Sequence, residues 1–411
     1  MSKKGRVFSG ARPTGRQHLG NYLGAIQNYV ALQDDYDCVY CIVDVHALTT
    51  VETTQELRQN TFEMAVDWLA AGIRPEETIL FVQSHVPEVM ELHTYLSMVT
   101  ALGKLTDLPT FKEKVQQQPE NVNYGLLGYP VLMTADIVLY KTDFVPVGID
   151  QAPHLEFARE VERSFNYLYN TKALIEPQVK HTEVLKVLGI DGKAKMSKSL
   201  NNHIELASTP EETAARVKDM VTDPARIKRT DPGNPDICNV FSMHKIFSPQ
   251  EEVDMINIEC RRAGIGCVDC KKRFAANLNS HLEPFRAKRA ELASKPDYVN
   301  DVLNDGGKRA RVIALLQRVG LEDCLHKRPN EMSGGQNQRC ALVRALAHAP
   351  KIVLADEPTG NLDRQTGQEV FSLMRELNCE SGVAFVMITH DEQLAQIADR
   401  RLHIEDGELR V

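Results

Sequence analysis

The chain has 411 residues, 43% of them hydrophobic and 25% charged, a composition that suits a globular protein of two or three domains and excludes a disordered chain. The net charge of −8 repels nucleic acid weakly overall, so any contact with nucleic acid requires a local basic patch. No apolar stretch reaches the length of a membrane span and the first residues lack a secretory signal, so we expect a cytoplasmic protein without membrane insertion.

The first two hundred residues alternate apolar strands with amphipathic helices. Strands are predicted at residues 6–9, 38–45 and 78–82, of which the second is nearly continuous in apolar residues, as in a strand buried on both faces. Apolar residues at helical spacing predict helices at 19–32 and 54–71. The alternation predicts an α/β fold, a Rossmann-like doubly wound parallel sheet that binds ligands at the carboxyl ends of its strands.

A change of pattern follows Ser208-Thr209-Pro210-Glu211-Glu212, which has the cap, proline and acidic first turn of a helix start. From there the pattern is helical, with few strand signals, to about residue 316. Strand patterns return at 351–354 and 383–388. We therefore predict three domains: an α/β domain at 1–205, an α-helical domain at 206–314 and a partial α/β segment at 315–411.

Two segments of the first domain pair as a nucleotide site. In Gly15-Arg16-Gln17-His18-Leu19-Gly20-Asn21 a turn leads into a helix whose free N–H groups can face phosphate. The loop Lys195-Met196-Ser197-Lys198-Ser199 carries two lysines that can neutralise charge on a departing pyrophosphate. Either segment alone also suits a plain turn or a solvated loop, whereas together they predict ATP chemistry.

With Phe8-Ser9-Gly10 and the segments 111–114, 129–136 and 145–151, these motifs make residues 1 to about 312 resemble the tryptophanyl-tRNA synthetases, a family of class I aminoacyl-tRNA synthetases. The resemblance implies a tryptophan–tRNA ligase that forms tryptophanyl-adenylate from ATP and L-tryptophan with Mg²⁺, and then charges tRNA(Trp). It also implies that the helical domain binds the anticodon and that the enzyme is a homodimer.

The resemblance assigns roles to individual residues. It implies ATP binding by Arg12, His18, Gly20, Asn21, Asp150, Lys195, Met196, Ser197 and Lys198, and catalysis by Asn21, Lys114, Lys195 and Lys198. It implies tryptophan binding by Phe8, His46, Tyr129, Met133, Asp136 and Gln151, with Asp136 accepting the indole N–H. A buried acceptor rejects phenylalanine-like competitors because they leave it unpaired. Taken singly, Met133 also suits core packing and His46 a satisfied strand-end histidine. Arg12 stands where many bacterial relatives have Gln.

Four of the nine cysteines fall in the helical domain, at Cys238, Cys260, Cys267 and Cys270, with 21, 6 and 2 residues between them. In a cytoplasmic protein they are thiols or metal ligands rather than disulfides, and the Cys-x₂-Cys pair is typical of a metal site. Buried thiols are the alternative. Some tryptophanyl-tRNA synthetases resemble this spacing and carry a [4Fe–4S] cluster, so we favour the cluster, with zinc as second choice. Flanking arginines and lysines at 261–262 and 271–273 are candidates for tRNA phosphate contacts.

From about residue 312 the chain resembles the C-terminal half of an ABC transporter ATP-binding subunit of the lipoprotein-releasing kind. The residues that carry this resemblance are Ser333, Gly334, Gly335, Gln336, Asp356, Glu357, Asp363 and His390. No Gly-x-x-x-x-Gly-Lys-Ser/Thr occurs in the sequence, so this half lacks its own phosphate anchor and we expect it to be inactive. An ABC ATPase component or a regulatory module for an ABC partner is the alternative function, and the missing loop counts against it.

Overall fold

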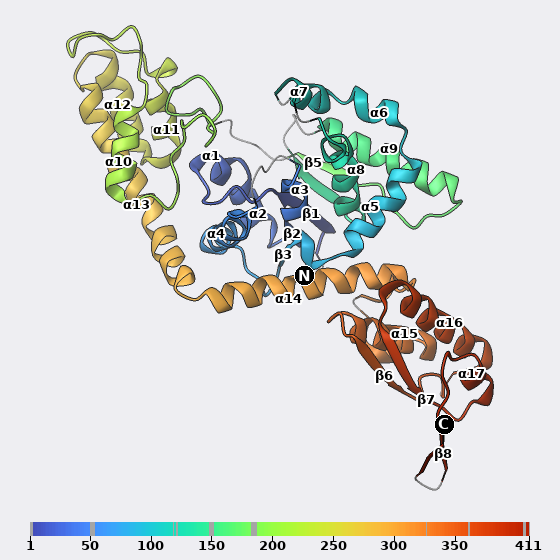
Figure 1. The fold of residues 1–411 in the computed structure, drawn as a ribbon. Helices are drawn as coiled ribbons and strands as arrows, with labels where there is room; N and C mark the ends of the chain where they lie inside the picture. The colour runs from blue at the N-terminus through green and yellow to red at the C-terminus, as the bar shows by residue number, and fades with distance from the viewer. Residues whose placement is uncertain are drawn as a thin grey trace. The chain divides into compact units, whose positions relative to one another are not determined.

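The computed structural model describes residues 3–49, 54–117, 119–120, 122–147, 152–181, 187–325, 327–360, 362–405 and 408–410. The chain divides into two compact units, Met1–Gly307 and Lys308–Val411, with the division inside helix α14 (Pro296–Arg318). The first unit contains both the α/β part and the helical part (Figure 1). The limits expected at residues 205 and 314 stay predictions.

The sheet of the first unit is parallel, with strand order β3-β2-β1-β4-β5. Its strands are β1 (Arg6–Ala11), β2 (Asp37–Ile42), β3 (Ile79–Val82), β4 (Phe144–Val147) and β5 (Gln178–His181). The chain adds strands outward from β1 on one side and then crosses to β4 on the other. This confirms the predicted doubly wound sheet, and it places the switch in strand order, where such sheets bind ligands, between β1 and β4.

Helices surround this sheet (Figure 1). In chain order they are α1 (Leu19–Asn21), the π-helix η1 (Tyr22–Ile26), α2 (Gln27–Leu32), α3 (Asp44–Ala47), α4 (Leu57–Ala70), α5 (Glu88–Val99), α6 (Leu102–Asp107), α7 (Pro109–Gln117), α8 (Tyr124–Val138) and α9 (Ala152–Leu168). The helices predicted at 19–32 and 54–71 are present. The core between the sheet and α4 includes Tyr29, Tyr40 and Trp68, with the two tyrosine rings stacked at 4.7 Å.

The strand predicted at residues 38–45 is too long, because β2 ends at Ile42 and α3 begins at Asp44. The Asp44 carboxylate accepts hydrogen bonds from the backbone N–H groups of Val45 at 2.9 Å and Ser84 at 3.0 Å. An acidic side chain that binds free N–H groups favours the start of a helix. The apolar run in the sequence does not indicate that the strand ends at Ile42.

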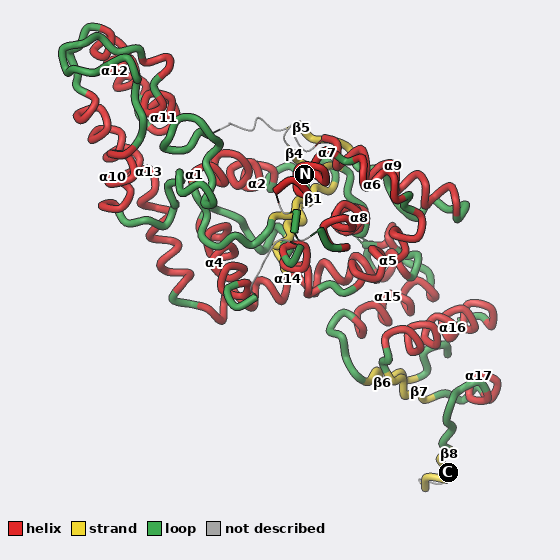
Figure 2. The backbone as a smooth tube through the Cα atoms, turned by 45° about the horizontal axis from the view of Figure 1, so that its top comes forward, coloured by secondary structure: helices red, strands yellow, loops and turns green. Residues whose placement is uncertain are grey.

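The helical part contains α10 (Pro210–Asp219), α11 (Asn239–Phe247), α12 (Gln250–Arg261), α13 (Cys267–Ala293) and the start of α14. Figure 2 shows helices and loops without strands through this region. The predicted helix start is confirmed: the Thr209 hydroxyl accepts the Glu212 N–H at 3.2 Å, and the Glu212 carboxylate accepts the Thr209 N–H at 2.9 Å. In the core of the helical part, Phe274 and Leu278 of α13 pack in one cluster with Leu19 and Met196 of the two nucleotide motifs.

The second unit comprises the end of α14, α15 (Gly334–Leu346), β6 (Ile352–Asp356), α16 (Arg364–Ser381), β7 (Ala384–Ile388), α17 (Glu392–Gln396), β8 (His403–Glu405) and β9 (Glu408–Arg410). Strands β6 and β7 pair in parallel, as a sheet of two strands. One face of the sheet packs on a core that includes Val370 and Met374, while Leu354 and Ile388 on the other face are 79% and 63% exposed. Among the described residues of either unit, no helix is long and apolar enough to span a bilayer.

Candidate active site

A cavity of about 480 Å³ opens where β1 and β4 end. Its lining includes most of the residues expected to bind tryptophan and some expected to act on ATP: Phe8, Arg12, His46, Lys114, Tyr129, Met133, Asp136 and Lys195. It also includes Ser9, Thr110, Ile137 and His154, for which no role was predicted. The predicted binding residues Asp150 and Gln151 lie outside the described part of the chain.

Asp136 on α8 is 2% exposed and presents one unpaired oxygen. Its Oδ2 accepts a hydrogen bond from Nε2 of Gln83 at 2.7 Å, whereas its Oδ1 has no hydrogen-bond partner among the described residues. Burial raises the pKa of the Asp136 carboxyl to about 8, although the bond from Gln83 opposes the rise. A buried acceptor without a partner requires a donor from a ligand.

Gln83 sets the orientation of Asp136. It lies in the 3₁₀ helix η2 (Gln83–His85) directly after β3 and is fully buried. Its Oε1 accepts the backbone N–H of His46 at 3.0 Å, so its Nε2 is the atom that faces Asp136. Sequence reasoning missed Gln83, and the available signal was a polar side chain at the end of an apolar strand.

Positive charge gathers beside the Tyr129 ring. The Lys114 ammonium lies 3.6 Å from the ring centroid, and the Tyr129 hydroxyl donates to Thr110 Oγ1 at 2.9 Å. Burial and the nearby Arg12 lower the pKa of Lys114 to about 8. Burial, Arg12 and Lys114 lower the pKa of His46 to about 3, so this imidazole is neutral at physiological pH. A neutral His46 can exchange hydrogen bonds with a substrate but cannot supply a charge.

His154 on α9 is a second residue that sequence reasoning left without a role. Its ring centroid lies 5.8 Å from that of Tyr129, and its Nδ1 is buried without a hydrogen-bond partner among the described residues. Burial lowers the pKa of His154, with Lys114 adding to the effect. His154 therefore adds to the cavity lining another polar atom, Nδ1, that has no partner in the described part of the chain.

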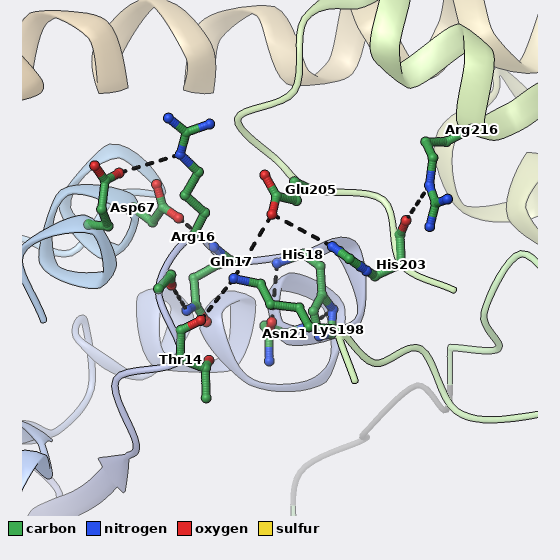
Figure 3. A network of polar contacts seen from close by, with 12 residues as sticks. Thr14, Arg16, Gln17, His18, Asn21, Asp67, Lys198, His203, Glu205 and Arg216 are labelled. Carbon is green, nitrogen blue, oxygen red and sulfur yellow. Dashed lines mark hydrogen bonds and ion pairs between the residues drawn. The ribbon is translucent and has the colours of Figure 1, made fainter. Parts of the chain in front are cut away.

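The first nucleotide motif forms a compact cap (Figure 3). His18 Nδ1 accepts the Asn21 N–H at 3.3 Å, and Asn21 Oδ1 accepts the His18 N–H at 3.1 Å. A Cβ atom on Gly20 would lie 3.0 Å from the His18 ring and 3.2 Å from Met196. A side chain at residue 20 would therefore require the His18 ring or Met196 to shift by a few tenths of an ångström. Burial lowers the pKa of His18 to about 4.

The loop at residues 195–199, which carries Lys195 and Lys198, lies against the cap formed by His18 and Asn21. Lys195 lines the cavity, whereas Lys198 does not: its Nζ donates to the Thr14 carbonyl at 2.8 Å and lies 4.0 Å from Glu205 Oε1 (Figure 3). The Ser197 N–H donates to Asn202 Oδ1 at 2.8 Å. The structure therefore brings both predicted motifs together, with one lysine directed at the cavity and the other bound to the turn.

The four cysteines of the helical part lie close enough for their charges to interact. Burial raises the pKa of Cys270 to about 12, and the charges of Cys238, Cys260 and Cys267 add to the rise. However, no three His, Cys, Asp or Glu side chains of the described chain are arranged to hold a metal ion. Two of the thiols have other partners: Cys260 Sγ accepts from Arg226 at 3.7 Å, and Cys270 Sγ is 3.5 Å from His244 Nε2. The expected metal-ligand geometry is therefore not found.

The ABC-like residues mostly make local contacts in the second unit. Ser333 and Gln336 form a capping box at the start of α15, and Asp363 caps α16. A Cβ atom on Gly335 would lie 2.4 Å from Thr366, so this glycine lets the two helices approach. His390 Nδ1 lies 2.8 Å from Glu357 Oε1, and the hydrogen bond with Glu357, together with its charge, raises the pKa of His390. Asp356 ends β6, and Gly334 begins α15.

Two family models match the chain: class I tRNA synthetases (W and Y) over residues 1–283, and ABC transporters over residues 242–360. A tryptophan–tRNA ligase of Deinococcus radiodurans is 46% identical over 314 residues, which cover 75% of this chain and 94% of the relative. The ligase of Thermotoga maritima is 42% identical, with coverage of 75% and 95%. The crystal structure of tryptophanyl-tRNA synthetase from Campylobacter jejuni with ADP and tryptophan has a TM-score of 0.72 at 34% identity, covering 77% of this chain and 98% of that one.

Proposed function

Because the chain belongs to the tryptophanyl-tRNA synthetases and is a tryptophan–tRNA ligase, we propose roles for its residues in binding and activating the substrates. The single observation that supports them best is the unpaired Oδ1 of buried Asp136 in the cavity. This oxygen accepts the indole N–H of tryptophan, while Gln83 holds the carboxyl group in place. Phe8 forms an apolar wall for the ring.

The polar end of tryptophan binds beside Tyr129. Arg12 and Lys114 supply positive charge for its carboxylate and for the triphosphate, and neutral His46 supplies a hydrogen bond to the carboxylate. Tyr129, Met133 and Gln151 surround the amino group. These assignments are supported by the shared cavity of Arg12, His46, Lys114 and Tyr129.

ATP binds between the two nucleotide motifs, where Mg²⁺ would help to neutralise the charge of the phosphates. The carboxylate of tryptophan attacks the α-phosphorus, and pyrophosphate departs with the electrons of the broken P–O bond. Lys195 already faces the cavity, and Lys198 exchanges the Thr14 carbonyl for phosphate. Catalysis is by orientation and by neutralisation of the charge on pyrophosphate, without a covalent enzyme intermediate.

Tryptophan-dependent exchange of pyrophosphate into ATP tests these roles. The wild-type chain should catalyse exchange with tryptophan, and Asp136→Ala should remove most of it. Exchange with tyrosine but not with tryptophan would reject the substrate site described above. Charging of tRNA(Trp) is then measured with the same preparation.

We also propose that the four cysteines bind a [4Fe–4S] cluster, with zinc as the alternative. The proposal is supported by four free thiols whose charges interact, and by Arg226, which can offset negative charge on the thiolates. Binding would require the side chains to turn from their present partners, and the bound group would then cross-link the start of α13 to the segments before it. Anaerobic purification should yield bound iron and sulfide. Bound zinc without iron would support the alternative, and a preparation that contains neither iron nor zinc would reject the metal site.

A homodimer is proposed on the basis of an exposed apolar surface. Tyr95 and Met98 on α5 and Leu102 on α6 are 52%, 74% and 64% exposed. Exposed apolar groups clustered in this way favour a protein interface. Light scattering should give the mass of a dimer, and Met98→Glu should give a monomer, whereas Ile258→Glu on α12 should not. A monomeric wild-type chain would contradict the proposal.

The second unit is proposed to be an inactive remnant of an ABC ATP-binding subunit. The match to the ABC model and the capped motif helices support the resemblance, and the missing phosphate loop argues against hydrolysis. The competing function, an ABC ATPase component, requires ATP hydrolysis in the absence of tryptophan. Phosphate release at the level of buffer alone is the expected result.

A further inference from the structure

A buried carboxylate outside the cavity joins three segments that lie far apart in the sequence. Asp67 on α4 is fully buried, and both of its oxygens are used. Its Oδ2 accepts the backbone N–H of Gln17 at 2.6 Å, and its Oδ1 accepts Nε of Arg289 on α13 at 2.6 Å. One side chain of α4 therefore binds the turn of the first nucleotide motif and the long helix of the helical part.

The neighbouring charges extend this network. The guanidinium of Arg289, 12% exposed as a side chain, also pairs with Glu63, one turn before Asp67 on α4. Arg16 Nε lies 3.7 Å from the same Glu63 oxygen. Burial raises the pKa of Asp67 to about 6, and the charge of Arg289 opposes the rise. Removing Arg289 would leave a buried carboxylate without its cation.

The turn held by Asp67 is the turn that binds Lys198 (Figure 3). Gln17 Nε2 closes it by donating to the Gly15 carbonyl at 2.8 Å, and the Gln17 carbonyl accepts the Leu206 N–H at 2.9 Å. Burial lowers the pKa of Lys198, and the carboxylates of Glu205 and Asp67 oppose this change. The electrostatic environment of a lysine proposed to bind phosphate therefore includes Asp67.

Helix α13 carries the other end of this connection. It begins at Cys267 and reaches Arg289 about 33 Å further along its axis. From these contacts we infer that Asp67 and Arg289 are positioning residues, which hold the turn at residues 14–18 in its ATP-binding geometry and tie it to α13. The inference rests on the proposed ATP site. It assigns no contact with substrate to either residue.

The test measures KM separately for ATP and for tryptophan in pyrophosphate exchange. Asp67→Asn and Arg289→Gln should each raise KM for ATP about tenfold, as for one lost charge-assisted hydrogen bond, and leave KM for tryptophan within about twofold. The double variant should be less impaired than the sum of the single effects, because both changes break the ion pair between Asp67 and Arg289. Arg289→Lys keeps the charge and should recover part of the loss.

Arg286→Gln is the matched control, because Arg286 lies on the same helix and binds Thr213 of α10 at 2.8 Å, away from the turn. It should leave both KM values unchanged. An ATP KM within about twofold of wild type in folded Arg289→Gln and Arg289→Lys, or an equal rise of both KM values, would overturn the inference. Should Asp67→Asn fail to fold, the Arg289 variants decide. Loss of wild-type exchange would instead reject the proposed function.

Discussion

Replacing Asp136 with asparagine tests how the cavity recognises an indole. The change keeps the size of the side chain and alters only one terminal atom. Gln83 cannot adapt, because its Oε1 accepts the His46 N–H at 3.0 Å and its Nε2 must therefore donate toward residue 136. If the new amide turns its oxygen to Gln83, its NH₂ faces the indole N–H. If it turns its oxygen to the indole, two NH₂ groups face each other. Either way one hydrogen bond is lost.

The expected cost follows from that count. Above pH 8, where the Asp136 carboxylate has formed, one hydrogen bond to this charged group contributes about 1.5–3 kcal/mol, so kcat/KM for tryptophan should fall by a factor of about 10–150. The assay is pyrophosphate exchange over a range of tryptophan concentrations. KM for ATP should change little, and thermal unfolding should show no loss of stability, since the substitution removes a buried carboxyl group. A tryptophan KM within about twofold of wild type would refute the assigned role of Asp136.

Further predictions concern pH, the nucleotide motifs and the second unit. Burial raises the pKa of Asp136 to about 8, so KM for tryptophan should fall as the pH rises through 8 and the carboxylate forms. If the Asp136→Asn variant kept the same pH dependence, a different group would be responsible for it. Gly20→Ala places a methyl group 3.0 Å from the His18 ring and should raise KM for ATP about tenfold; a normal KM would mean that the ring can move aside at no cost. Lys198→Ala should lower the exchange kcat about a hundredfold without a change in melting temperature, and an unchanged kcat would leave Lys195 as the main phosphate partner. Limited proteolysis should trim the chain to a core that ends between about residues 310 and 326, with exchange retained, because β6 and β7 expose Leu354 and Ile388. Protease resistance beyond residue 331 equal to that of β2 would instead show that the second unit is a stable domain.

The sequence by itself determined the features that depend on neighbouring residues. Apolar runs and helical spacing predicted the strands and helices of an α/β fold, and the cap at Thr209 and Glu212 was predicted from its local pattern. Residues within motifs that resemble a known family, such as His18 and Asp136, were also predicted from the sequence, because such a motif is a short run of neighbouring residues. Helices, strands and helix caps depend on interactions between residues that are close in the sequence, so the spacing of residue types predicts them directly.

The tertiary structure decided which distant groups meet. It ended β2 at Ile42 and placed Asp44, at the start of α3, where it binds the N–H of Ser84, 40 residues away. Parallel pairing of β2 with β3 brings Gln83 beside His46, and the packing of α8 places Asp136 on its other side. Asp67 and Arg289 are separated by 222 residues, and only the packing of α13 on α4 joins them. A buried polar side chain takes its function from the partner it meets, and that partner depends on strand register and helix packing across the whole chain.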